Sequence, residues 1–200
     1  MNLDTAHLIA LAAALGWASG LRLYLVVFLT GAAGALGWVD LPSGLDVLEH
    51  PVVLGGSAVL ALVEFVADKI PAINAVWDAL HTLLRIPAGA ALAAGVFGGD
   101  QAQWAVLAAL AGGALAATSH AAKTSGTAVL AGFPEPFTHA GVSLLADLSV
   151  PAMLWLALAH PLAFAFVLLV LVAGMATLAT LLFRVLRALF ARVLRRAAGA

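Results

Sequence analysis

The chain has 200 residues, of which 64% are hydrophobic and 10% are charged, and its mean hydropathy is +1.10. Soluble domains are about 45–50% apolar and about 25% charged. This composition therefore excludes a water-soluble globule, a disordered tail and a nucleic-acid binder, and it indicates an integral membrane protein. The net charge is −1, and the absence of cysteine excludes disulfides, thiolate metal sites and cysteine nucleophiles.

The N-terminal segment, MNLDTAH, has one acid and no Lys or Arg before the first apolar stretch. A cleavable secretory signal carries a basic segment at that place. We therefore expect the stretch to be retained as a membrane span.

Six apolar stretches are long enough to cross a bilayer, which takes roughly 20 residues per helix. Breaks rich in Gly and Pro separate them. The first stretch is long enough to tilt or to carry an irregular centre at Gly16–Gly20. We predict an all-α integral membrane protein forming one domain over residues 1–200, with spans at about 6–35, 52–70, 75–98, 102–125, 137–159 and 161–186.

Lys and Arg mark the cytoplasmic side of a membrane protein. Five arginines lie in the last seventeen residues: Arg184, Arg187, Arg192, Arg195 and Arg196. With six spans, both termini are then predicted to be cytoplasmic in the inner membrane, and the acidic loop 36–51 lies outside. The basic, amphipathic segment 184–200 is expected to lie along anionic lipid headgroups as a helix.

The two halves of the chain, 6–98 and 102–186, resemble each other weakly. In each half an apolar span carries a central acid, Glu64 or Asp147, and a proline follows a few residues later. Three spans per half place the halves in opposite orientations, which predicts an inverted repeat of the kind found in secondary transporters. Chance similarity between Ala/Leu/Gly-rich helices is the alternative.

Charged residues interrupt the predicted spans, although each costs about 2.5–3.5 kcal/mol at a helix centre. Residues three or four apart share one helix face, and this spacing joins Glu64 to Asp68 and Asp78 to His81 and Arg85. The candidate ion- or substrate-binding residues are Ser19, Arg22, Glu64, Asp68, Lys69, Asp78, His81, Arg85, Lys123 and Asp147. Their four acids and four bases form either a transport pathway or a structural salt-bridge network with bases that reach the interface.

No motif for a metal, a cofactor or catalysis is present. Asp78 and His81 make at most a weak metal pair, and Gly16–Gly20 lacks the arrangement of a serine nucleophile. We expect no metal, no cofactor and no enzymatic activity. The spacing of Gly16 and Gly20 permits close helix packing.

Three segments are similar to a bacterial membrane family called domain of unknown function 4126: Ala18-Ser-Gly-Leu-Arg22, Val63-Glu-Phe-Val-Ala-Asp-Lys-Ile-Pro71 and Lys123-Thr-Ser-Gly. The resemblance covers about residues 8–160. The chain has Glu135-Pro136 where the family has Asn-Pro, and Ala146-Asp147 where it has paired acids. The resemblance supports the choice of site residues and implies no activity.

The favoured function is a small transporter or channel-like protein. Glu64 and Asp147 would bind a proton, small ion or solute near the membrane midplane, and Arg22 and Lys123 would neutralise them. The alternatives are a membrane scaffold with structural ion pairs and a lipid-handling protein with a basic lip at Arg85 and Lys123. A wet cavity favours the first, a dry bundle with paired charges the second, and a lateral opening the third. The lipid bilayer and a second copy of the chain are the other expected partners.

Overall fold

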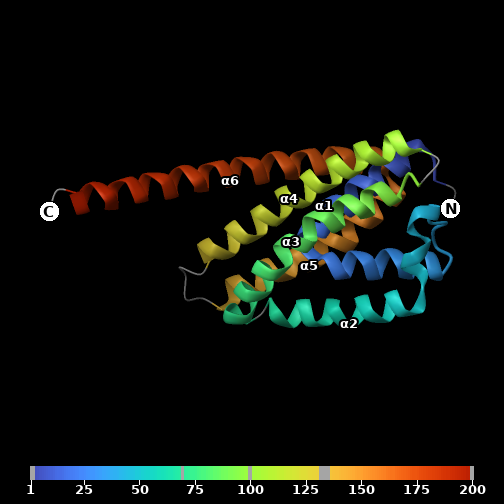
Figure 1. Ribbon diagram of the computed structural model, residues 1–200, viewed down its shortest axis with the longest axis horizontal. Coiled ribbons are helices and arrows are strands. Elements are labelled where there is room, and N and C mark those ends of the chain that lie inside the picture. Colours follow the sequence, from blue (N-terminus) through green and yellow to red (C-terminus); the bar gives the residue numbers. More distant parts are fainter. Residues whose placement is uncertain (1–2, 69, 99–100, 131–135, 199–200) are drawn as a thin grey trace.

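The computed structural model describes residues 3–68, 70–98, 101–130 and 136–198, and these ranges contain helices and loops but no strand. The all-α prediction is confirmed. Lys69 lies outside the described residues. The elements, shown in Figure 1, are α1 (Thr5–Ala35), the 3₁₀ helix η1 (Ser43–Glu49), α2 (Pro51–Ala67), α3 (Pro71–Gly95), α4 (Ala102–Leu130), α5 (Pro136–Ala159) and α6 (Pro161–Ala198).

Helix starts follow from residues that suit the first turn. Four helices begin at a proline, where the missing N–H has no intrahelical partner to lose. Asp4 caps α1 by accepting a hydrogen bond from the backbone N–H of His7 at 3.0 Å. The predicted break at His160 is confirmed, but α6 continues as one helix to Ala198, twelve residues beyond the predicted end of its span at 186.

In the part of the chain that the structure describes, three helical segments are long and apolar enough to cross a membrane: Thr5–Ala35, Ala102–Gly126 and Pro161–Leu178. A fourth is obtained if η1 and α2, which meet at a bend of 69°, count as one span. These segments indicate a membrane protein.

Helix α1 folds back on itself at Arg22, whose φ of −145° and ψ of 77° are extended. Leu11 in the first half and Leu29 in the second half line the same cavity, whereas a straight helix would separate them by roughly 27 Å. In Figure 1 both ends of α1 lie at the same end of the molecule. The irregular centre expected at Gly16–Gly20 therefore lies at Arg22 instead.

The folded α1 is the centre of the bundle and packs against η1 and against each of α2 to α6. Its contact with α4 is close because glycine occupies the crossing point. A Cβ atom on Gly16 would come within 2.5 Å of the Cα of Gly112, and one on Gly20 within 2.0 Å of the Ser119 hydroxyl. The close packing predicted from the Gly16/Gly20 spacing is confirmed at both positions.

The two halves of the chain do not pack alike. Helix α1 packs against α5, whereas α4 and α2, the corresponding pair, do not pack against each other in the described residues. The bend in α1 also has no counterpart in α4, which is one continuous helix. The inverted repeat therefore stays a prediction.

Candidate functional site

Six charged side chains from different parts of the chain meet inside the bundle, and we call them the ion-pair network. They are Arg22 at the bend of α1, Glu64 in α2, Asp68 at the C-terminal cap of α2, Arg85 in α3, Lys123 in α4 and Asp147 in α5. These side chains are between 0% and 12% exposed. Among the described side chains three acids face three bases, so these six groups are formally neutral together, as buried charges require.

The guanidinium of Arg22 links three helices. Its Nη1 lies 2.8 Å from Asp68 Oδ2, and its Nη2 contacts Asp147 Oδ1. It also donates to the Glu64 carbonyl at 3.3 Å and to Ser143 Oγ at 3.2 Å. The bend in α1 puts this side chain at the tip of the folded helix, where one planar fork reaches both carboxylates.

Asp68 is shared between two bases. In addition to its contact with Arg22, its carboxylate accepts from Lys123 Nζ at 2.9 Å and 3.1 Å. The backbone N–H of Asp68 donates a hydrogen bond to the Glu64 carbonyl, and Asp68 is the C-terminal cap of α2. A chain of ion pairs therefore runs from α4 through the end of α2 to α1 and α5.

A second chain of contacts runs through Arg85. Its Nη2 donates to Glu64 Oε1 at 2.7 Å, and its Nη1 lies 3.1 Å from Nδ1 of His120. The other ring nitrogen of His120, Nε2, lies 2.8 Å from Thr82 Oγ1. The second oxygen of Glu64, Oε2, is buried and has no hydrogen-bond partner among the described residues.

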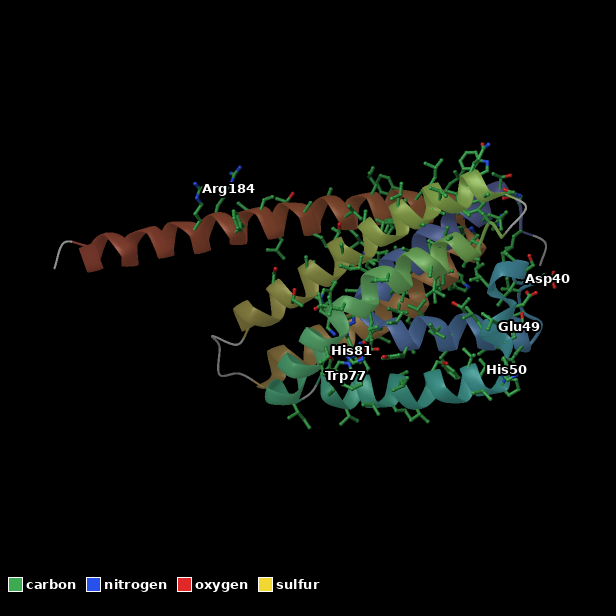
Figure 2. The ribbon with its side chains drawn as sticks, viewed as in Figure 1. Asp40, Glu49, His50, Trp77, His81 and Arg184 are labelled. Carbon is green, nitrogen blue, oxygen red and sulfur yellow. The ribbon has the colours of Figure 1, made fainter. Side chains whose placement is uncertain are left out.

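His81 and Trp77, labelled in Figure 2, form an aromatic cluster with Tyr24. The His81 ring stacks on Trp77 with centroids 4.0 Å apart, and its Nδ1 donates to the Trp77 carbonyl at 2.8 Å. Its Nε2 lies 3.0 Å from the Tyr24 hydroxyl. Among the described residues, no group of three or more metal-ligating side chains comes together.

The structure brings together six of the ten candidate residues and places His81 beside them. In the described contacts Ser19 does not bind the ion-pair network, because its hydroxyl donates to the Leu15 carbonyl of its own helix. Lys69 and the side chain of Asp78 lie outside the described part of the chain. The candidate set missed four partners, His120, Thr82, Tyr24 and Ser143. His120 precedes Lys123 by three residues, and this helical spacing was the signal that could have found it.

The described cavities lie away from the network. One of about 340 Å³ lies between the two halves of α1 and α5, and one of about 500 Å³ lies between α1, α4 and α6. Their walls are almost entirely apolar, and none of the described cavities is lined by a residue of the ion-pair network. In this conformation the six side chains of the network are buried and lie in ion pairs with one another.

One family model, described as Domain of unknown function (DUF4126), matches residues 9–181 and so includes the whole ion-pair network. Neither the curated proteins nor the solved structures contain a match to the chain.

Proposed function

The chain belongs to the family described as Domain of unknown function (DUF4126), and we propose that it is a multi-pass transporter or channel-like protein of the inner membrane. Its ion-pair network is the proposed binding site for a proton or another small ion or solute. The observation that carries this proposal is the meeting of three acids and three bases at the bend of a broken helix.

Two physical arguments support a role in transport. Apolar residues of similar volume usually stabilise a protein interior as well as a buried ion pair does, or better, so six buried charges are poorly explained by stability alone. Broken helices whose ends meet near the bilayer midplane form the ion and substrate sites of many secondary transporters. Arg22 stands at such a break, and Glu64 lies thirteen residues after the start of α2, about 20 Å along its axis.

The path of α1 leads us to amend the expected topology. With both of its ends at one end of the bundle, α1 enters and leaves from the same side, and α2 to α6 make five crossings. The acids Asp40 and Glu49 lie at that end in Figure 2, whereas Arg184 lies toward the other. By the positive-inside rule, the N-terminus and the loop 36–50 are then outside and the C-terminus is cytoplasmic. This replaces the six-span arrangement with both termini inside.

Part of the inverted repeat is compatible with this topology. In Figure 1, α2 and α3 run in directions opposite to α5 and α6, as an inverted repeat requires. The proposed repeat is therefore limited to these two helix pairs, together with the second half of α1 against α4.

Transport in this arrangement requires an ion pair to open. Arg85 and Glu64 are at most 1% exposed and contact each other directly, so no ion reaches Glu64 Oε1 until the guanidinium moves. This conformation is then the closed state, and the Oε2 atom of Glu64, which has no hydrogen-bond partner among the described residues, can bind an ion or a proton once the pair has opened.

The decisive experiment is a flux measurement on the full-length protein in liposomes that contain a pH-sensitive dye and carry an imposed proton gradient. We expect the wild type to collapse the gradient faster than protein-free liposomes, and Glu64→Gln to abolish the difference. Asp46→Asn, an exposed acid in η1, is the matched control and should keep wild-type flux. The same liposomes are tested with Na⁺, K⁺ and Cl⁻ gradients, and an absence of flux in all four would overturn the proposal.

The second candidate is a membrane scaffold whose ion pairs are structural. The pairing of the three acids with three bases and the burial of all six side chains favour it. A scaffold gives no flux with any gradient, so the liposome measurement separates the two candidates. The lipid-handling alternative needs an open lip at Arg85 and Lys123, and no observation favours it because these side chains are 0% and 9% exposed.

A further inference from the structure

His120 makes two contacts that only a neutral imidazole can satisfy together. The Nη1 atom of Arg85, 3.1 Å from His120 Nδ1, can donate a hydrogen bond but cannot accept one. Nδ1 must therefore carry a lone pair, and the ring proton lies on Nε2. That nitrogen donates to Thr82 Oγ1 at 2.8 Å. The position of Arg85 thus fixes both the tautomer and the charge of His120.

His81 has no such restriction. Its Nδ1 must donate to the Trp77 carbonyl, which can only accept, and its Nε2 faces the Tyr24 hydroxyl. A hydroxyl donates or accepts by turning about its C–O bond. His81 can therefore take up a second proton and keep both hydrogen bonds, whereas His120 cannot.

We infer that the ion moved by this protein is a proton, and that it binds at Nδ1 of His120 and releases Arg85 from Glu64. This inference rests on the transport function proposed above. A proton from the aqueous phase takes the lone pair of Nδ1. Nη1 of Arg85 then loses the lone pair to which it donates and faces a second cation across 3.1 Å, while Nη2 still donates to Glu64. Repulsion between the two cations displaces the guanidinium and opens its pair with Glu64.

The surrounding charges support a proton over a metal cation. His120 lies on α4 and faces Arg85 of α3. The other charged groups of the network are Glu64 in α2, Asp68 at the cap of α2, Arg22, Asp147 and Lys123, which lies one turn after His120 on α4. On α6, which also packs against α4, the first charged residue is Arg184. An alkali cation would compete with a guanidinium or ammonium group for each of the three acids. A proton needs only one lone pair, and histidine is the side chain that ordinarily exchanges its proton between about pH 5 and 8.

The inference is tested by nitrogen NMR of the full-length protein, labelled with ¹⁵N-histidine and ¹⁵N-arginine, as the pH is lowered from 8 to 5. At pH 8 we expect His120 to be protonated at Nε2 alone and Arg85 to give exchange-protected guanidinium signals. As the pH falls, both nitrogens of His120 should become protonated, and the protected signals of Arg85 should be lost in the same pH range.

Two variants serve as controls. His120→Gln offers Arg85 an amide oxygen and Thr82 an amide N–H, and it cannot titrate, so the Arg85 signals should persist to pH 5. His81→Gln should leave their loss unchanged. If His120→Gln does not fold, substituting the other five histidines one at a time identifies the His120 signals by elimination.

A His120 ring that stays neutral down to pH 5, or Arg85 signals that persist after it is protonated, would overturn the inference. Either result together with flux of Na⁺, K⁺ or Cl⁻ in liposomes would leave the transport function standing. Loss of the Arg85 signals as expected, without proton flux, would instead show a proton-operated switch and reject proton transport.

Discussion

Arg85 Nη2 lies 2.7 Å from Glu64 Oε1, and the two side chains are 0% and 1% exposed. This ion pair links α3 to α2 in the protein interior, where water does not solvate either charge. Removing one partner leaves the other charge buried and unpaired, which usually destabilises a protein by about 3–5 kcal/mol. The pair therefore holds α2 and α3 together, and its opening is the step that the proposed function requires.

We expect Glu64→Ala and Arg85→Ala each to lower the thermal unfolding temperature in detergent strongly. The double variant Glu64→Leu/Arg85→Met, which removes both charges and keeps the apolar volume, should recover most of the loss because no unpaired charge remains. Asp46→Asn should leave the unfolding temperature unchanged. Additive losses in the double variant would show that the two residues are not energetically coupled.

The amended topology is tested with single cysteines, which the cysteine-free chain allows without background labelling. Thr5→Cys and Ser43→Cys lie at exposed positions of the proposed outer end, and Arg187→Cys lies at an exposed position of α6. An impermeant maleimide should label the first two in intact cells and the third only after permeabilisation. Protection of Thr5→Cys in intact cells would restore the six-span arrangement.

Gly20→Ala should destabilise the bundle although it adds only a methyl group. The new Cβ would lie 2.0 Å from Ser119 Oγ and 2.2 Å from the Ala116 carbonyl oxygen, so the backbones of α1 and α4 must separate. Overpacking of this kind typically costs 1–3 kcal/mol. Gly55→Ala in α2 meets nothing within 4 Å and should be neutral or stabilising, because alanine favours a helix by up to about 1 kcal/mol over glycine. Equal unfolding temperatures for the two variants would contradict the close contact of α1 with α4.

The sequence predicted those features that depend on local rules. Breaks rich in Gly and Pro located the helices. The helical spacing of charges joined Glu64 to Asp68, and in the next predicted span it joined Arg85 to Asp78 and His81. The bend at Arg22 left no such signal. One residue with extended φ and ψ needs neither glycine nor proline, and the apolar stretch around it is as hydrophobic as that of a straight span.

The long-range contacts of the site could not be predicted from the sequence, for a related reason. Asp68 binds Arg22 and Lys123, which come from helices whose relative positions depend on the fold of α1. The role of His120 depends on which ring nitrogen faces Arg85, and spacing along one helix carries no information about that.

The last prediction concerns the choice of arginine at position 22. Arg22 contacts Asp68, Asp147, Ser143 and the Glu64 carbonyl through the two terminal nitrogens of one planar group. Lysine keeps the charge but offers a single nitrogen, which cannot reproduce a fork that spans two carboxylates. In Arg22→Lys, either Asp68 or Asp147 should therefore lose its contact with residue 22 inside the bundle. We expect a lower unfolding temperature in detergent and a smaller flux in liposomes. The matched control is Arg184→Lys, the same replacement at an exposed position of α6, which should have no effect on either measurement. If Arg22→Lys behaves as Arg184→Lys does, charge alone suffices at the bend, and the guanidinium does not link α1, α2 and α5 in the way described here.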